Sequence, residues 1–242
     1  MKKFMFSIAA LLTAQVLFAQ MKEGTIIYER KINMHRKITD EQMKAMIPEF
    51  RTSRHQLLFS DSTSRYKAVV EENAPDPFAP AGGGQVMIRM GADGSEQYRN
   101  FSEAKLIKSR ELGAKTYIIE DSIKQQGWKL TDETKIILNY VCKKATRTNE
   151  RGAEIEAWYA ENFLTPAGPE NFAGLPGAIL QLDINKGEIV FTALSISDKV
   201  DKKEIHEPKK GKKITRAEFT KLMQDMMGNP GPGGNRVIRI GG

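Results

Sequence analysis

The stretch ENFAGLPGAILQLDI, residues 170–184, places two glycines and a proline directly before an apolar run. Proline fixes φ near the value required at the second position of a β-turn, and glycine accepts the positive φ required at the third. We therefore predict a type II turn over Leu175–Ala178, followed by a buried strand, Ala178–Ile184. Gly174, Leu175, Pro176 and Gly177 form the structural motif of this corner. Such a loop can hold a ligand or simply redirect the chain, and folding alone explains these residues.

Short alternating segments continue on both sides of this corner. In Gly24–Met34, for example, Ile26 and Tyr28 alternate with Ile27 and Glu29. Many short strands separated by turn residues are typical of antiparallel all-β folds. The predicted class is all-β leaning towards α+β, with a curved, mostly antiparallel sheet (a half-barrel or open barrel) and two short helices. Further strands are expected at 55–59, 66–70, 105–112, 115–120, 122–129, 134–145, 154–160 and 188–197, and a hairpin is expected at 85–101.

Two capping boxes predict the helices. In this motif a hydroxyl and a Glu or Gln three residues later each accept a backbone N–H bond at the helix start. Thr39 with Gln42 begins a helix that runs to about Phe50, and Thr215 with Glu218 begins a second helix that Gly228 closes.

The first residues predict export. Two lysines precede an apolar segment, Phe4–Leu12, and Ala19-Gln20 offers a small-residue cleavage point. This is the arrangement of a secretory signal peptide, and no other run approaches the ~20 apolar residues of a spanning helix. The protein is expected to be periplasmic or secreted after cleavage, without a lipid anchor, because no cysteine lies near the cut. The predicted divisions are a signal peptide (1–19), a single β-rich domain (20–227) and a Gly/Pro-rich flexible tail (228–242).

The charge balance is basic, with 37 basic and 30 acidic side chains and a net charge of +7. For an exported protein this surplus favours an anionic membrane surface or an acidic glycan over nucleic acid. A solvated surface explains it more simply. We therefore predict no nucleic-acid partner and a contact with the membrane that is peripheral at most.

Cys142 is the only cysteine, so an internal disulfide is impossible. Alternation in 134–145 places it on one strand face with Ile136, Leu138 and Tyr140. A thiol on an apolar face usually behaves as a small buried hydrophobe. We predict a structural role for it, since a catalytic thiol needs a nearby histidine.

The corner, together with several upstream motifs, resembles the signature of the GLPGLI family of Bacteroidetes envelope proteins. Gly168-Pro169 with Phe172, the Ala157-Trp158-Tyr159 strand, Asn139–Ala145 and Trp128-Lys129-Leu130 fit the family pattern in order and spacing. The chain departs from the pattern at Ala178, where the family prefers leucine. The resemblance covers Tyr117–Ile196 and implies an envelope location; it implies no established activity, cofactor or catalytic residue.

The chemistry-bearing residues are scattered. The three histidines have no zinc-ligand spacing, and no serine lies in a nucleophile elbow. We predict no catalytic residues, no metal site and no cofactor. The alternative is a hydrolase or metal-dependent enzyme that uses His35, His55 and nearby carboxylates, if these side chains converge in a cleft.

Aromatic side chains crowd around the corner. They are either core residues or the lining of a curved sheet that shelters an apolar ligand. The predicted ligand or partner surface consists of Trp158, Tyr159, Phe163, Phe172 and Leu175. The predicted function is an exported, non-enzymatic envelope protein that binds an apolar small molecule, a lipid or an envelope protein at or near the outer membrane. A purely structural envelope subunit is a further alternative.

Overall fold

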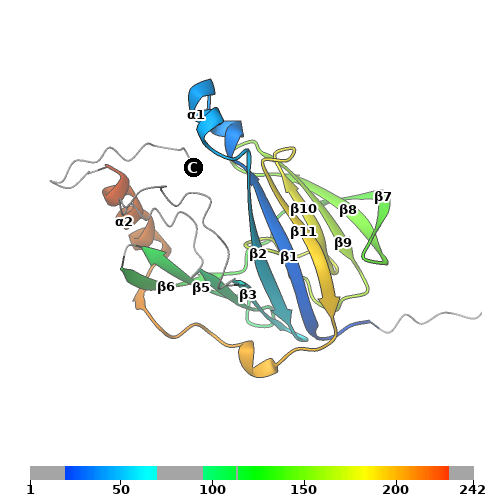
Figure 1. Cartoon of the computed structure of the whole chain (residues 1–242). Coiled ribbons are helices and arrows are strands. Elements are labelled where there is room, and N and C mark those ends of the chain that lie inside the picture. Colours follow the sequence, from blue (N-terminus) through cyan, green and yellow to red (C-terminus); the bar gives the residue numbers. More distant parts are fainter. Residues whose placement is uncertain (1–19, 70–94, 113, 229–242) are drawn as a thin grey trace, which may run out of the picture.

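A computed structural model describes residues 20–69, 95–112 and 114–228. Twelve strands form one sheet in the order β12-β6-β5-β4-β3-β2-β1-β11-β10-β9-β8-β7 (Figure 1). Two antiparallel meanders, β1–β6 and β7–β11, are joined where β1 pairs with β11. The strands are β1 (Gly24–Asn33), β2 (Phe50–Phe59), β3 (Thr63–Ala68), β4 (Glu96–Asn100), β5 (Lys105–Leu112), β6 (Lys115–Ser122), β7 (Lys129–Ile137), β8 (Tyr140–Thr148), β9 (Glu154–Ala160), β10 (Ala178–Ile184), β11 (Ile189–Ser197) and β12 (Lys212–Ile214).

The two α-helices lie at different margins of the sheet. Helix α1 (Glu41–Met46) follows a 3-10 turn, η1 (Met34–Lys37), and stands beyond one end of β1 and β2 (Figure 1). Helix α2 (Arg216–Gly228) lies beside β6, where Phe219 packs edge-on against Tyr117. The short strand β12 precedes α2 and is the parallel exception in the sheet. No described helix has the length and apolar character needed to cross a membrane.

The sheet curls towards one face, which we call the concave face. The Tyr28 hydroxyl on β1 donates to the Ile179 carbonyl on β10 at 2.6 Å, across the intervening strand β11. The ring of Phe163, in the β9–β10 connection, contacts Phe59 on β2 and Tyr140 on β8. Strands this far apart share a neighbour only because the sheet bends around it. The predicted class, an open and curved mostly antiparallel sheet with two helices, is confirmed.

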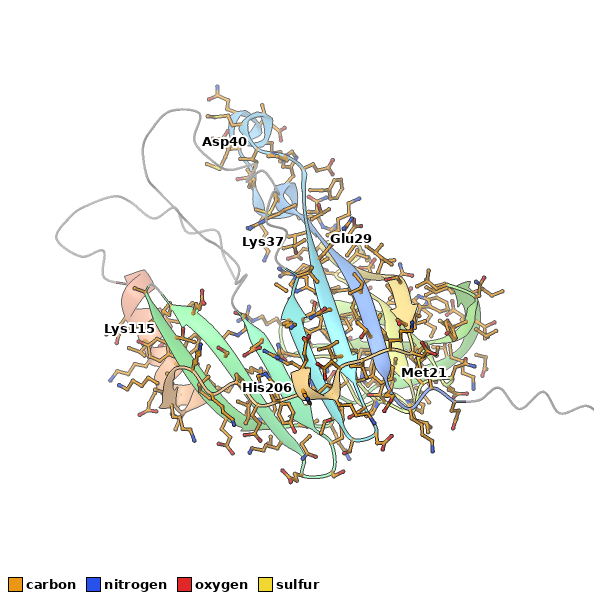
Figure 2. All side chains as sticks on the ribbon, turned by 60° about the horizontal axis from the view of Figure 1, so that its bottom comes forward. Met21, Glu29, Lys37, Asp40, Lys115 and His206 are labelled. Carbon is orange, nitrogen blue, oxygen red and sulfur yellow. The ribbon has the colours of Figure 1, made fainter. Side chains whose placement is uncertain are left out.

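The β9–β10 connection, residues 161–177, fills the concave face beneath β1, β2 and β8–β11. The main core lies here, and its largest fully buried side chains include Phe59, Tyr159, Phe163 and Leu175. A smaller apolar cluster of Tyr98, Ile107 and Ile118 lies on the opposite, outer face. Ile205 packs against this cluster. It belongs to a segment that crosses the outer face and contains the 3-10 turn η2 (Lys202–Glu204) and His206 (Figure 2).

The predicted type II turn at Leu175–Ala178 is wrong in detail. The Gly177 N–H donates to the Leu175 carbonyl at 2.8 Å, so the chain turns within three residues. This tighter turn needs the fixed φ of Pro176. Gly177 has a positive φ of 151°, and a Cβ there would lie 2.1 Å from the Ala160 carbonyl oxygen. The backbone of the corner therefore approaches the sheet closely at Gly177. It does not do so at Gly174, where the surrounding space is open.

The strand expected at 134–145 is two strands. Leu138 and Asn139 both adopt positive φ (48° and 67°) and form a tight turn between β7 and β8. Two successive positive φ values match the twist of a hairpin, and asparagine tolerates them. Cys142 is buried as predicted, but it does not continue a strand face from Ile136 and Leu138, whose side chains are exposed.

Two further local predictions differ from the structure. Asp40, rather than Thr39, caps α1, and its carboxylate accepts the N–H groups of Gln42 and Met43. The segment expected as a strand at 122–129 is mostly irregular. The hairpin expected at 85–101 lies partly outside the described residues, as do the predicted signal peptide and nearly all of the predicted tail. By contrast, the Thr215–Glu218 capping box is confirmed by reciprocal hydrogen bonds.

Candidate functional site

Charged and polar side chains gather on the concave face beside the apolar core. They come from β1, β4, β5 and the β9–β10 connection, and each lies within electrostatic range of another member. We call the following five side chains the cationic cluster: Arg30, Arg99, Lys108, Arg110 and Glu170.

Strand register explains why these side chains meet. Tyr66 on β3 pairs with Gln97 on β4, and Gln97 pairs with Lys108 on β5. Side chains of directly paired residues share a face, and so do residues two apart on one strand. Arg99 and Arg110 therefore project from the same face as this row.

Arg99 is the most buried member of the cationic cluster, with 2 % of its surface exposed. Its Nη2 lies 3.4 Å from the Gln97 Oε1, a long hydrogen bond, and its Nη1 has no partner among the described residues. Burial lowers the pKa of Arg99 to about 10, although the nearby Glu170 carboxylate acts in the opposite direction. Arg99 is thus a buried cation with unused hydrogen-bonding capacity, which is costly unless something pairs with it.

Further polar atoms beside Arg99 also lack partners. The Ser64 and Tyr66 hydroxyls are buried on β3 and make no hydrogen bond within the part of the chain that the structure describes. The His55 ring stacks on Tyr66 with centroids 5.2 Å apart, and its Nδ1 is likewise unpartnered. Buried polar groups in proteins are normally hydrogen-bonded. Several unpartnered groups on one face indicate a place for a polar ligand or for ordered water.

Glu170 is the only carboxylate in the cationic cluster. A turn closed by the Phe172 N–H and the Pro169 carbonyl holds it over the sheet, with a positive φ of 45°. Its Oε1 lies 3.2 Å from the Arg30 Nε, within ion-pair range but outside hydrogen-bond geometry. It also attracts Arg99 and Arg110, so one carboxylate serves three arginines.

Lys108 lies within electrostatic range of Arg99 and Arg110 in the cationic cluster and of Arg216 on α2. Burial, followed by the neighbouring Arg110 and Arg216, lowers the pKa of Lys108 to about 8. The nearest carboxylate, Asp121, opposes this shift, but it is already in an ion pair with Arg216 at 3.2 Å. The electrostatic potential at Lys108 is therefore dominated by cations.

The arginines of the cationic cluster are suited to binding an anion. Arginine forks and hydroxyls donate hydrogen bonds, and arginines pair readily with oxyanions. Burial and the positive charge of Arg30 lower the pKa of His55 to about 4. A base with so low a pKa is poorly matched to neutral conditions.

The five aromatic and apolar residues predicted as a ligand or partner surface do not form one surface. Trp158 lies on the outer face, where its Nε1 donates to Glu156 and Lys135 sits 4.0 Å from its ring centroid. Tyr159 follows it on the strand and points to the concave face. Tyr159, Phe163 and Leu175 are 2 %, 1 % and 2 % exposed and pack in the core, whereas Phe172 packs at its margin against Trp128. In this structure their contacts are those of core residues.

The two histidines of the enzyme alternative are not brought together. His35 lies in η1, where its Nε2 contacts the Ile47 carbonyl, while His55 lies further along β2 beside Ser53 and Tyr66. Within residues 20–69, 95–112 and 114–228, no group of three or more His, Cys, Asp or Glu side chains is placed to hold a metal ion. Burial raises the pKa of the Cys142 thiol to about 11, which agrees with the predicted structural role.

A separate open cleft of about 500 Å³ lies on the outer face. Residues of β1–β3 form its floor, and the segment from Lys199 to Glu204 forms a wall. Of the four charged residues in its lining, Lys67 and Glu204 already pair at 2.8 Å. This pair of opposite charges in the outer cleft is thus already neutralised within the protein, whereas the cationic cluster contains polar atoms that lack partners among the described residues.

With this geometry established, comparison with known proteins identifies a family. A family model described as the N-terminal domain of the N-glycanase peptide (PNGase F-II) matches residues 94–220, just over half of the chain. The chain belongs to this family. The matched region contains four of the five members of the cationic cluster, with Arg30 outside it.

Solved structures agree with the assignment at the level of the fold. Two crystal forms of PNGF-II superpose with TM-scores of 0.58 and 0.58, at 14% and 15% sequence identity. The alignments cover 85% of this chain but only 34% and 33% of the PNGF-II chains. The chain thus spans about a third of the length of PNGF-II. No curated protein sequence matches it significantly.

Sequence reasoning missed the cationic cluster. The available signal was alternation, because Lys108 and Arg110 are two apart, as are Gln97 and Arg99. Such a pattern usually marks a solvated strand face. The strand alone does not show that the sheet curls over that face.

Proposed function

We propose that this protein is a non-enzymatic ligand-binding module of the cell envelope that is exported with cleavage of its signal peptide. The observation that carries the proposal is the set of buried, unpartnered polar atoms on the concave face, with Arg99 Nη1 at its centre. Proteins keep such costly groups where a ligand satisfies them. The ligand site is the concave face over β3–β5.

The family supports a modular role. Its model describes the N-terminal domain of an N-glycanase, and this chain spans about a third of the PNGF-II structures. A domain of this kind can bind on its own the molecule on which a larger enzyme acts. This argument for the present chain is an analogy based on family membership. The GLPGLI resemblance of the corner is compatible with the same proposal and supports an envelope location.

The aromatic residues near the corner give little support to an apolar ligand. The polar residues on the same face give more support to a polar ligand. Phe163 and Leu175 contact core neighbours on the concave face and are fully covered. An apolar ligand would have to displace them. The polar side of the same face already holds groups that lack partners.

A capture experiment tests the proposed function. Affinity-tagged protein is incubated with envelope extract, and small molecules released on denaturation are identified by mass spectrometry. We expect a stoichiometric, chemically unaltered compound that the bare resin does not retain. Recovery of nothing beyond the resin control, or of a cleaved product, would contradict a non-enzymatic binding module. Mass spectrometry of the mature N-terminus checks export separately, since an intact Met1 would exclude cleavage.

The β7–β8 hairpin favours a second candidate, a structural or protein-binding role. Ile136 and Val141 are directly paired across the hairpin and are 72 % and 59 % exposed. Exposed apolar side chains at a sheet edge are typical of association sites. Ile136→Lys tests this role, since it should abolish an association seen by light scattering without lowering the melting temperature. An unchanged molar mass would remove this candidate.

A further inference from the structure

The cationic cluster has more positive than negative charge. In the part of the chain that the structure describes, Glu170 is the carboxylate that acts on Arg30, Arg99 and Arg110, while Asp121, which acts on Lys108, is paired with Arg216. Among the described residues, no ion pair joins Lys108 or Arg110 to a carboxylate. In a partly buried setting, uncompensated charges interact more strongly than at the surface. The concave face therefore attracts an anion.

The unpartnered hydrogen-bonding groups of the site also favour an anion, because they can act as donors. Arg99 Nη1 is a donor without a partner, and arginine has no acceptor atom. The adjacent Tyr66 and Ser64 hydroxyls are also unpartnered and can donate. A ligand group that satisfies all three must offer several acceptor oxygens at once. Oxyanions offer such oxygens, and their hydrogen bonds to arginine are among the strongest in proteins.

We propose that the cationic cluster binds an oxyanion group of the ligand, with Arg99 as its buried anchor and Lys108 and Arg110 as its outer contacts. This inference rests on the proposed function and names the chemistry of the ligand. Lys108 and Arg110 are half-buried, so they are more accessible to an oxyanion from solvent than Arg99 is. Either a phosphate or sulfate group or the carboxylate of an acidic sugar supplies the required oxygens.

The affinity depends on pH through Lys108. The charged groups that face it are Arg99 on β4, Arg110 on β5, Asp121 on β6 and Arg216 on α2. The pKa of Lys108 lies at about 8, so its ammonium is largely charged at pH 7 and largely neutral at pH 9. Oxyanion binding weakens over this interval.

Isothermal titration calorimetry at low ionic strength tests the inference on the whole protein. The probes are inorganic phosphate, sulfate and galacturonate, which separate the two sources of the oxyanion. We expect saturable binding of at least one probe, weakened about ten- to hundredfold by Arg99→Met and by Arg110→Gln. Arg151→Gln is the matched control, because Arg151 is exposed in the β8–β9 turn and its loss changes the net charge equally. Binding to this variant should equal that of the parent.

Specific results overturn the inference. No saturable binding of any probe, or equal weakening by Arg151→Gln and Arg110→Gln, shows that the cationic cluster is not an oxyanion site. If Arg99→Met fails to fold by circular dichroism, Arg110→Gln decides alone, since its side chain is only half-buried. With sulfate or galacturonate as the probe, whose charges do not change between pH 7 and pH 9, Lys108→Gln should bind with the same affinity at both pH values, and a persisting pH dependence would contradict the role of Lys108.

The two proposals fail in different ways. If envelope extract yields a ligand that Arg99→Met and Arg110→Gln retain fully, the protein is a binding module but the oxyanion inference is wrong. If phosphate, sulfate or galacturonate binds through Arg99 and Arg110 while the extract yields no ligand, the oxyanion inference stands and the envelope function is wrong.

Discussion

The concave face of this sheet is apolar beneath β8–β11 and cationic beneath β3–β5. In the apolar half, Phe163, Leu175 and Ile179 are almost completely buried and fill the space against the sheet. In the cationic half, Arg99 is as deeply buried, yet part of its guanidinium has no partner. The same face of the sheet thus buries well-packed apolar side chains in one half and an incompletely paired cation in the other.

The difference separates stability from function. Buried apolar side chains stabilise the fold, whereas an incompletely paired buried charge lowers its stability. Proteins depart from good packing mainly at functional sites. We infer that the apolar half holds the sheet in its curved shape, and that this shape brings the cationic half together.

The largest expected effect lies in the apolar half, at Gly177. In Gly177→Val the new Cβ would lie 2.1 Å from the backbone oxygen of Ala160, and the residue would have to keep a positive φ of 151°. We expect a loss of about 3–6 kcal/mol in the free energy of unfolding, measured by urea denaturation. Gly174→Ala is the control, because open space surrounds that residue, and it should cost about 1 kcal/mol. Equal losses in both variants would mean that the close approach at Gly177 is unimportant.

Phe163→Ala should destabilise the protein by about 3–5 kcal/mol. The ring is 1 % exposed and bridges Phe59 on β2 to Tyr140 on β8, so its loss leaves a cavity where the sheet curls. Thermal unfolding by circular dichroism measures the change. A cost under 1 kcal/mol would show that the ring does not maintain the curvature.

Acid should destabilise the protein through His55, at the boundary of the two halves. Its pKa is about 4 in the folded protein against 6.5 for an ordinary histidine, so the unfolded chain binds the extra proton between these values. Stability therefore falls as the pH drops from 6.5 to 4, by about 3 kcal/mol in total, and this contribution is constant above 6.5. In His55→Phe this slope should disappear from urea midpoints measured between pH 4 and pH 7. Parallel slopes in parent and variant would assign the acid sensitivity to other groups.

The smallest expected effect on stability has the opposite sign and lies in the cationic half. Arg99→Met replaces a buried cation with an apolar side chain of similar length, and Glu170 keeps Arg30 and Arg110 as neighbours. We expect the free energy of unfolding to stay the same or to rise by about 1–2 kcal/mol, measured by urea denaturation without added anions. A loss of 3 kcal/mol or more would make Arg99 a structural residue and remove the contrast between the halves.

The sequence by itself determined those features of the fold that depend on residues close together in the chain, such as strands and helix caps. The apolar run in Ala178–Ile184 and the pattern in Glu154–Ala160 predict strands that the structure contains with the same bounds. The Thr215–Glu218 capping box predicts the start of α2 because both hydrogen bonds lie within three residues. The corner at Gly177 was located correctly, although its turn type was not, because the contact with Ala160 is not local.

Only the tertiary structure decided which strand faces are enclosed. The residues Arg30, Arg99 and Glu170 are far apart in the chain and meet because β1, β4 and the β9–β10 connection lie on the inside of one curved sheet. A period of two shows which side chains share a face of a strand, but not whether that face meets water or another part of the protein. The same pattern that indicates a solvated surface at Lys108 and Arg110 thus forms a buried charged site, because sheet curvature depends on packing across the whole molecule.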